Sequence, residues 1–265
     1  MINTRTQILT LLTDFGLQDT YVGQMKGVIA QINPHLQVVD LTHNIPPQNL
    51  LAGHYCLMST YQYFPVGSVH VAVVDPGVGS QRRAVAVQIP EGYLVGPDNG
   101  LLSGVLSQSD PWAAVELTNP KYWRTSKLST TFHGRDLFAP VAAHLASGVL
   151  LQDLGKAIDP TTLIPGPLLA YSQSGNRIQG TIQYIDHFGN LITTLPATLV
   201  QNRRWQIQVQ GQVIPGGQTF SDVPVGALIS YVGSQGWVEM AVNQGNAAQV
   251  LQVTYADEVI CQMLS

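Results

Sequence analysis

A carboxylate directly after an apolar run near the start of the chain is the first group that could do chemistry. Segment 7–14 predicts a buried strand of a parallel sheet and ends in Asp14. Open α/β sheets bind ligands at the carboxyl ends of their strands, where a carboxylate commonly chelates the vicinal hydroxyls of a ribose. An aspartate that caps the following helix is an equally good interpretation of this segment alone.

A second predicted strand ends at Asp75, and a glycine-rich loop then leads to Arg82 and Arg83. The loop lacks the Gly-Lys-Ser/Thr ending of a phosphate-binding P-loop. Taken alone, it is more typical of a surface turn with solvated arginines. Further on, the segment 130–136 places His133 just ahead of a predicted helix, where an imidazole could serve in acid–base catalysis. A lone histidine is more often structural.

Two segments in the last third of the chain have the composition of hairpin turns. Ile185-Asp186-His187-Phe188-Gly189-Asn190 ends a predicted strand, and Gly233-Ser234-Gln235-Gly236 lies inside the segment 231–242. Taken alone, each gives only a weak functional signal.

The elements that must position these residues alternate between strands and helices in the first part of the chain. Short apolar runs predict strands, and apolar residues spaced by three or four predict helices. Strands are predicted at 7–14, 36–41, 68–75, 84–89 and 93–96, and helices at 20–32, 49–60, 100–106 and 136–147. This alternation predicts an α/β N-terminal domain with a largely parallel sheet.

The pattern changes after residue 155. Three prolines fall within 159–167, and apolar and polar residues then alternate at 178–185, 205–209 and 250–255. We therefore predict a C-terminal all-β, barrel-like domain, with recurrent glycines in its turns. The predicted division is an α/β domain at 1–165 and a β-barrel domain at 166–265.

Composition narrows the class of function. Charged residues make up 11% of the chain, and 12 Lys+Arg against 16 Asp+Glu give a formal net charge of −4. A basic surface for nucleic acid is therefore not expected. No apolar run approaches the roughly 18 residues of a membrane helix, and the start of the chain lacks a signal-peptide core. The two cysteines fit a reducing compartment. We expect a cytoplasmic protein, and the scarcity of charge favours burial of some surface in an oligomer.

Five motifs occur in an order that resembles a known family. They are Thr-Asp-Phe-Gly (13–16), Val-Val-Asp-Pro-Gly-Val-Gly (73–79), Gly-Pro-Asp-Asn-Gly (96–100), Thr-Phe-His-Gly-Arg-Asp (131–136) and Asp-His-Phe-Gly-Asn (186–190). Nearly the whole chain is similar to the S-adenosyl-L-methionine hydroxide adenosyltransferases, which are related to fluorinase and chlorinase. The resemblance implies an N-terminal α/β domain and a C-terminal β-barrel domain. It also implies a homotrimer, with active sites between the N-terminal domain of one subunit and the C-terminal domain of the next.

The resemblance also implies roles for individual residues. Asp14 would hold the ribose hydroxyls, and the family's water-activating triad maps onto Asp75, Arg82 and His133. The remaining implied contacts are Asp19 and Tyr21 near the amino-acid end of the ligand, Asp186 on the methionine ammonium, Ser234 on its carboxylate, and Phe188, Asn190 and the backbone near Ala241, Val242 and Asn243 on the adenine.

Two positions depart from the halogenase branch of the family. Gln48 stands where that branch has an aromatic residue, and Gln235 stands where it has an arginine. The halogenases also carry other residues at the Asp and His positions of the triad, so the resemblance favours water over halide as the nucleophile. Arg83 lies next to Arg82, and the sequence leaves open which of the two is active.

The reaction that this implies is hydrolysis of S-adenosyl-L-methionine at C5′, giving adenosine and L-methionine, with no cofactor and no metal. The sulfonium leaves readily, so the difficulty lies in water, whose pKa of about 15.7 must be lowered by a cation or a base. Three alternatives stay open. One is a sensor that binds S-adenosylmethionine or a nucleoside without turnover, and another is a halogenase. The third is a metal-dependent hydrolase, whose candidate ligands would be Asp14, Asp40, Asp75, Asp98, His43 and His133.

Overall fold

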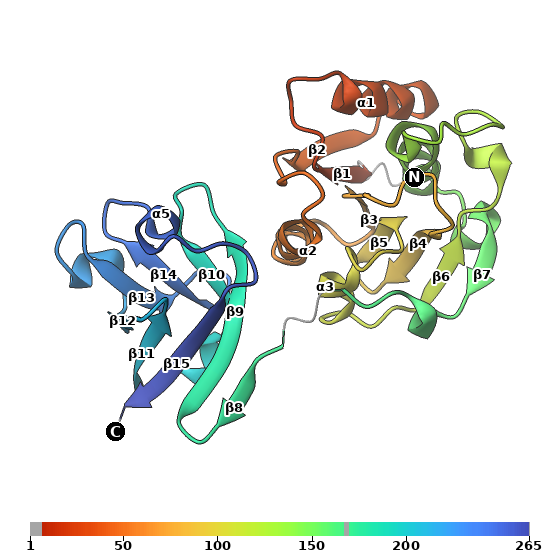
Figure 1. Cartoon of the computed structure of the whole chain (residues 1–265). Coiled ribbons are helices and arrows are strands. Elements are labelled where there is room, and N and C mark those ends of the chain that lie inside the picture. The colour runs from red at the N-terminus through yellow and green to blue at the C-terminus, as the bar shows by residue number, and fades with distance from the viewer. Residues whose placement is uncertain (1–6, 167–169, 265) are drawn as a thin grey trace. The chain divides into compact units, whose positions relative to one another are not determined.

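The computed structural model describes residues 7–166 and 170–264. The chain divides into two compact units, 1–167 and 168–265 (Figure 1), and each is described by itself.

The N-terminal unit contains a seven-stranded sheet in the order β2-β1-β3-β5-β4-β6-β7. Strand β1 pairs in parallel with β2 and β3, and β3 pairs in parallel with β5. Strands β4, β6 and β7 extend the sheet with antiparallel pairs. The bounds are β1 Ile8–Thr13, β2 Gln37–Thr42, β3 Ser68–Val73, β4 Ala84–Ile89, β5 Gly92–Pro97, β6 Ala113–Glu116 and β7 Lys156–Ile158. The predicted strands and the largely parallel α/β class are confirmed.

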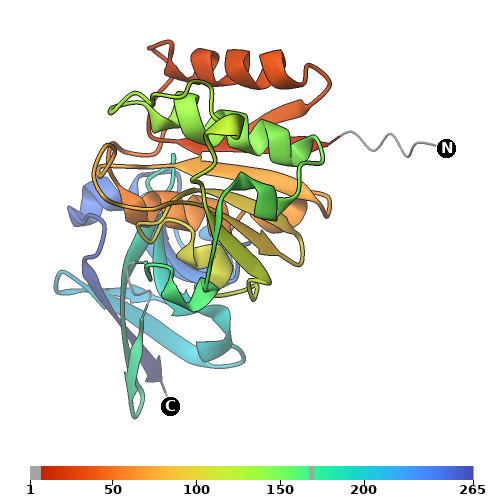
Figure 2. The same ribbon diagram turned by 90° about the vertical axis from the view of Figure 1, so that its right-hand side faces the viewer.

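Helices cover both faces of this sheet. Figure 2 shows α1 (Tyr21–Ile32, red) beside α4 (Ala139–Ala146, green) along one face. On the other face lies α2 (Leu50–Met58), with α3 (Ser103–Leu106) beside it; α2 packs so closely that a Cβ on Gly53 would crowd Leu101 and Val74. The predicted helix 136–147 begins earlier, as a π-helical turn at Gly134–Phe138 that continues directly into α4.

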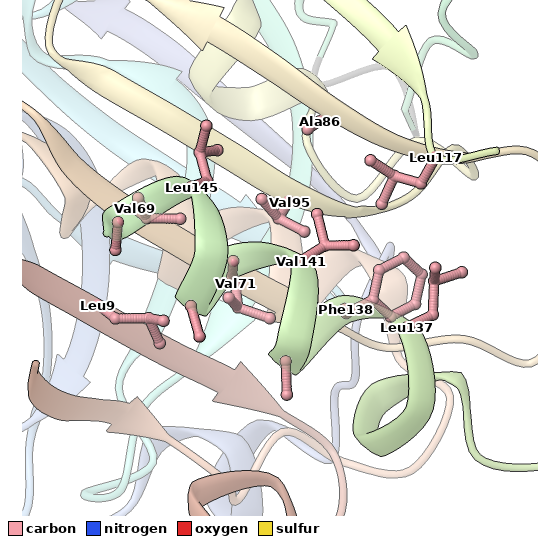
Figure 3. Packing of buried hydrophobic residues seen from close by; sticks show 14 of the residues in the cluster. Leu9, Val69, Val71, Ala86, Val95, Leu117, Leu137, Phe138, Val141 and Leu145 are labelled. Atoms are coloured by element: carbon pink, nitrogen blue, oxygen red, sulfur yellow. The ribbon is translucent and has the colours of Figure 1, made fainter. Parts of the chain in front are cut away.

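The core between the sheet and α4 consists of aliphatic side chains that alternate along the strands. Leu9, Val71 and Val95 lie on the face of the sheet against which the helical segment with Val141 and Phe138 packs (Figure 3), and all five are at most 2% exposed. Because alternate residues of a strand share a face, this packing follows from the period of the apolar pattern. The strand ends, and so the residues that follow them, are fixed by this core.

The C-terminal unit is a nearly closed antiparallel barrel with strand order β12-β11-β15-β9-β10-β14-β13. Strand β8 pairs with β9, and Gly217 N donates to Ser230 O at 2.8 Å where β12 approaches β13. This confirms the predicted all-β, barrel-like class. The bounds are β8 Ser172–Ser174, β9 Arg177–Ile185, β10 Leu191–Pro196, β11 Arg204–Val209, β12 Gln212–Pro215, β13 Leu228–Val232, β14 Trp237–Val242 and β15 Glu258–Leu264.

One predicted strand is wrong. The segment 250–255 begins in the short helix α5 (Ala247–Leu251), and the last strand is β15 instead. Asn246 caps α5 by accepting a hydrogen bond from Gln249 N at 2.8 Å, and Gln252 ends it in the left-handed region with φ 54°. The apolar side chains that alternate in this segment therefore belong to the end of a helix and the turn after it.

The remaining short helices are single turns that join these elements. They are η1 Tyr61–Tyr63, η2 Pro120–Tyr122, η4 Leu151–Leu154, η5 Pro160–Thr162, η6 Ala197–Leu199 and η7 Phe220–Asp222. None of the helices in the described part of the chain combines the length and apolarity that crossing a membrane requires.

Truncating the core should destabilise the N-terminal unit. We expect Leu9→Ala to lower its free energy of unfolding by about 2–5 kcal/mol, because Leu9 is fully buried and its removal leaves a cavity. Leu150→Ala is the matched control, since Leu150 is 59% exposed and should change the free energy by less than about 0.5 kcal/mol. Urea unfolding measures both. Equal effects of the two variants would contradict the assigned core.

Candidate active site

A cavity of about 290 Å³ lies where β1 and β3 end in the N-terminal unit. Its walls come from the loop after β1, the loop after β3 and the loop that leads into the π-helical turn. This is the strand edge at which open α/β sheets bind ligands. Its lining includes Asp14, Phe15, Gln48, Asp75, Phe132 and His133. Phe15 and Phe132 were not singled out from the sequence, although both lie inside the quoted motifs.

Asp14 is held at the rim of the cavity by polar contacts around the end of β1. Gln48 N donates to Asp14 Oδ2 at 2.8 Å. The preceding Thr13 is buried, and its Oγ1 lies 2.8 Å from His43 Nδ1 and accepts a hydrogen bond from Phe15 N at 3.2 Å. The strand end is thus fixed from both sides, and its carboxylate faces the cavity.

Arg82 joins Asp75 to His133. Its Nε lies 2.8 and 3.0 Å from the two carboxylate oxygens of Asp75, and its Nη2 contacts both Asp75 Oδ2 and, at 2.8 Å, His133 Nδ1. The side chains of Arg82 and Asp75 are only 9% and 5% exposed, and the guanidinium carbon lies 5.4 Å from the centre of the Phe138 ring. Asp75 and His133 line the cavity, and Arg82 binds both of them.

The contact with Arg82 determines which nitrogen of His133 carries hydrogen. A guanidinium has only donors, so Nδ1 must accept, and the neutral ring then carries its hydrogen on Nε2. Burial and the charge of Arg82 lower the pKa of His133 from its ordinary 6.5, while Asp75 and Asp136 act in the opposite direction. This arrangement therefore favours a neutral imidazole with a free N–H donor.

Arg83 binds a different carboxylate. Its Nε donates to Asp98 Oδ2 at 2.8 Å and its Nη1 to Thr162 Oγ1 at 3.0 Å, while Asp98 Oδ1 accepts from Ile164 N at 2.8 Å. Successive side chains of an extended segment point to opposite sides, so the two arginines diverge. Arg82 is the one brought to Asp75 and His133.

The loops that carry Asp75 and His133 touch at Gly79. This glycine has φ 79°, and a Cβ there would overlap the carbonyl oxygen of Thr130. The two loops therefore pack backbone against backbone at a position that requires glycine.

Tyr21 lies against the aromatic wall of the cavity, whereas Asp19 does not reach it. The Tyr21 ring packs edge to face on Phe132 at 5.2 Å and on Phe15 at 5.9 Å between centroids. Tyr21 is 46% exposed, so its outer edge remains open. Asp19 is exposed and lies outside the cavity lining.

In the C-terminal unit, Asp186 organises the turn between β9 and β10. Its Oδ1 accepts from the backbone N–H of Phe188 at 2.9 Å and of Asn190 at 2.8 Å, and its Oδ2 accepts from Asn190 Nδ2 at 2.8 Å. Asn190 is buried, but Phe188 is 70% exposed. The turn is thus preformed and presents an aromatic ring on its surface.

The register of β14 places some predicted ligand contacts together and separates another. Leu191, the first residue of β10, pairs with Met240, so Ala241 and Val242 lie beside the 186–190 turn. Ser234 is exposed in the turn between β13 and β14, at the opposite end of β14. The predicted adenine contacts are therefore neighbours, and the length of β14 separates Ser234 from them.

Tyr231 and Glu239 lie between these two ends and were missed from the sequence. They pair across β13 and β14, and the Tyr231 hydroxyl donates to Glu239 Oε2 at 3.0 Å. Burial and the nearby Asp186 charge raise the pKa of Glu239. The available signal was a single carboxylate in the otherwise apolar strand Trp-Val-Glu-Met-Ala-Val.

Several groups of the alternative metal set are bound to cations of the protein. Asp40 Oδ2 lies 2.6 Å from Lys26 Nζ, and Asp75 and Asp98 bind the two arginines described above. Within residues 7–166 and 170–264, no three His, Cys, Asp or Glu side chains form a group that could hold a metal ion.

Removing Arg82 should raise the pKa of His133. In Arg82→Ala the cation that lowers this pKa is gone, while the Asp75 carboxylate that raises it remains. Titration of the His133 ring signal by NMR measures the change. Arg83→Ala is the control and should leave the His133 pKa where it is, because Arg83 binds Asp98. A lower His133 pKa in the Arg82→Ala variant than in the unchanged protein would contradict the described contact.

Comparison with known proteins places this geometry in a family. The family models of the SAM hydroxide adenosyltransferase N-terminal and C-terminal domains match residues 9–155 and 180–260. An (R)-S-adenosyl-L-methionine hydrolase of Salinispora arenicola is 42% identical over 96% of this chain and 97% of its own length. A fluorinase of Actinoplanes sp. is more distant, at 27% identity over 89% and 91% of the two chains. The crystal structure of an uncharacterized conserved protein from Thermotoga maritima superimposes with a TM-score of 0.89 at 33% identity, over 96% of this chain and 99% of that one. The chain therefore belongs to the SAM hydroxide adenosyltransferase family.

Proposed function

We propose that this protein hydrolyses S-adenosyl-L-methionine at C5′, giving adenosine and L-methionine. The observation that carries the proposal is the partly buried Asp75–Arg82–His133 contact at the wall of a cavity that Asp14 also lines. A hydrolase of S-adenosylmethionine that is 42% identical over nearly the whole chain supports it. A sensor that only binds S-adenosylmethionine does not need an aspartate, an arginine and a histidine in contact with one another at the wall of the cavity.

The cavity provides both positioning and a place for the nucleophile. Asp14 would hold the ribose hydroxyls at the rim, so that C5′ lies over the wall formed by Asp75 and His133. Holding the reacting atoms in line converts a bimolecular step into a unimolecular one. In-line attack also needs the sulfonium on the far side of C5′ from the water.

The chemical step balances without a cofactor. A water oxygen forms a bond to C5′, the C5′–S bond breaks, and its electron pair leaves with the sulfur as neutral methionine. The Nε2–H of neutral His133 would donate to the water oxygen and orient it, and Asp75 would accept the proton that is released. Arg82 would hold the Asp75 carboxylate in place and keep the imidazole in this tautomer.

The C-terminal unit would supply the remaining ligand contacts. Phe188, Asn190 and the backbone of 241–242 would contact the adenine, and Asp186 would bind the methionine ammonium. Ser234 would bind the methionine carboxylate, with Gln235 beside it in place of a charged partner. Asp19 and Tyr21 would lie near the amino-acid end of the ligand.

The configuration at sulfur is part of the proposal. The Salinispora arenicola relative is named for the (R) form. Because the L prefix describes the α-carbon, (R) describes the sulfonium centre, which carries three different groups. We propose that this chain also acts on the (R) sulfonium epimer. A cytoplasmic location, close to the supply of S-adenosylmethionine, belongs to the same proposal.

The direct test is chromatography of the purified protein with each sulfonium epimer, in heavy-oxygen water with chelator and without halide. We expect adenosine and methionine in equal amounts, with one heavy oxygen in the adenosine and faster turnover of the (R) epimer. Binding without turnover would favour the sensor. Inhibition by chelator would favour the metal-dependent hydrolase, and a requirement for halide would favour the halogenase. Each of these results would overturn the proposal.

Arg82→Ala is the control variant for this assay. It should lose turnover and still bind S-adenosylmethionine, because Arg82 acts on Asp75 and His133 and does not itself line the cavity. Equal loss of binding and turnover would contradict this role.

We also propose a homotrimer in which the N-terminal unit of one chain and the C-terminal unit of the next build each site. The low charge content is consistent with extensive buried surface between chains. Light scattering coupled to size-exclusion chromatography should give three times the chain mass of 28.6 kDa. The mass of a single chain in a sample that turns over substrate would contradict the shared site.

A further inference from the structure

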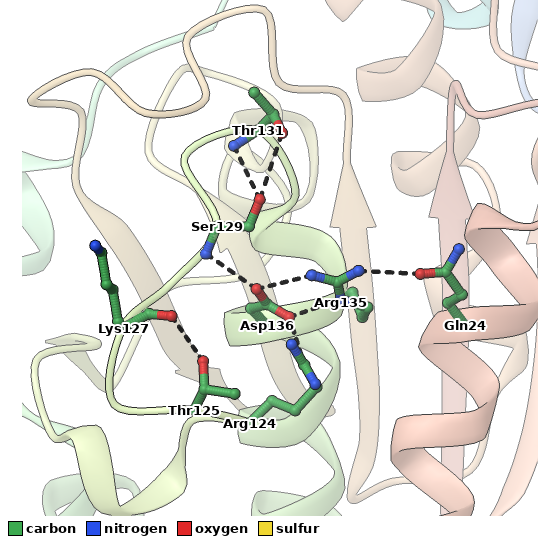
Figure 4. Close-up of polar contacts among 8 residues, drawn as sticks. All are labelled: Gln24, Arg124, Thr125, Lys127, Ser129, Thr131, Arg135 and Asp136. Carbon is green, nitrogen blue, oxygen red and sulfur yellow. Dashed lines mark hydrogen bonds and ion pairs between the residues drawn. The ribbon is translucent and has the colours of Figure 1, made fainter.

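Asp136 is a buried carboxylate to which the proposed reaction assigns no role. It is 1% exposed, and four hydrogen bonds converge on it (Figure 4). Oδ1 accepts from Arg124 Nε at 2.6 Å and Arg135 Nε at 2.7 Å, and Oδ2 accepts from Arg135 Nη2 and Ser129 N, both at 3.0 Å. Burial alone would raise the pKa of Asp136, but the bonds from Arg135 and Arg124 hold it well below its ordinary value.

These bonds close the loop that ends in His133. Arg124, at the start of the loop, also donates its backbone N–H to Asp136 O at 3.0 Å, and Ser129 binds the carboxylate from the middle of the loop. At the far end, Asp136 N donates to Phe132 O at 3.2 Å. Three points of the segment 124–132 are therefore tied to one residue.

The second guanidinium extends this anchor to the wall of the cavity. The Arg135 guanidinium carbon lies 4.9 Å from the centre of the Phe132 ring, and its Nη1 donates to Gln24 Oε1 of α1 at 3.0 Å. Phe132 lines the cavity next to His133 and packs on Tyr21. Asp136 thus fixes Phe132, the residue before His133, both directly and through Arg135, and does not itself line the cavity.

We propose that Asp136 is the positioning residue for His133: it closes the 124–133 loop so that the imidazole keeps its bond to Arg82 and faces the cavity. A carboxylate suits this role because it can accept several hydrogen bonds at once, and two arginines compensate the cost of burying it. The link to catalysis rests on the proposed hydrolysis, but the effect on His133 does not.

The charge of Asp136 adds a second effect that a purely mechanical anchor would not have. Of the charged groups around His133, Arg82 favours the neutral ring, whereas Asp75 and Asp136 favour the protonated one. Protonation of Nδ1 would break the bond to Arg82, so activity requires the neutral form. The charged groups that act on His133 are Asp75 and Arg82 after β3 and Asp136 on its own turn, and Asp14 after β1 lines the same cavity.

The test is Asp136→Asn, which keeps the shape and removes the charge. We expect the His133 pKa, titrated by NMR, to fall, and the acidic limb of the kcat/KM profile to move to lower pH with it. We also expect kcat to fall about 10- to 100-fold with a smaller change in KM, since a misplaced catalytic group costs rate more than binding.

Two further variants separate charge from anchoring. Arg135→Lys keeps the charge but loses the paired bonds, so it should lower kcat without moving the acidic limb. Asp153→Asn removes an exposed carboxylate from the short helix Leu151–Leu154 and should change neither kcat nor the acidic limb.

An unchanged His133 pKa in Asp136→Asn, or an equal shift in Asp153→Asn, would overturn the proposal. Because the NMR titration needs no turnover, this failure is distinguishable from absence of hydrolysis. Arg135→Lys, which preserves the charges of the cluster, provides the test if Asp136→Asn does not fold.

Discussion

The site depends on one guanidinium that is shared between a carboxylate and an imidazole beneath the surface. Arg82 binds Asp75 through two of its nitrogens and His133 through one of them. A buried charge is costly unless its partners are placed accurately, so this contact constrains everything around it. Strand β3 must end where it does, the loop after it must return to β4, and the segment before α4 must bring an imidazole to the same point. The Phe138 ring near the guanidinium couples the site to the apolar core.

The chain has few charged side chains, and several of them form ion pairs between the loops of the N-terminal unit. Of the 12 basic residues in the chain, four arginines are paired with only three carboxylates in the N-terminal unit. Those carboxylates, Asp75, Asp98 and Asp136, have side chains that are 5%, 3% and 2% exposed. The acidic groups thus act as fixed points to which arginines from neighbouring loops are tied.

The sequence predicted most elements of the α/β unit because its apolar periods are strong, but β6 and β7 were not among the predicted strands. The helix at 20–32 and the strand at 68–75 are examples in which pattern and structure coincide. The prediction of a strand at 250–255 failed because Leu251, Val253 and Tyr255 alternate as in a strand, whereas Leu251 ends α5 and the other two follow it. The sequence could not distinguish Arg82 from Arg83, because adjacent residues of one type differ only in the direction of their side chains, which only the structure shows. Glu239 was missed because its partner Tyr231 is defined by strand register.

The contact at Gly79 has a consequence for how this protein can evolve. The steric limit there comes from the carbonyl oxygen of Thr130, a backbone atom that every amino acid possesses. No compensating substitution at 130 can therefore make room for a side chain at 79, while the side chain at 130 is not what sets this limit. The two loops are therefore constrained unequally: this contact requires glycine at position 79, but it does not restrict the side chain at position 130. A lineage that alters the nucleophile must do so around this fixed glycine.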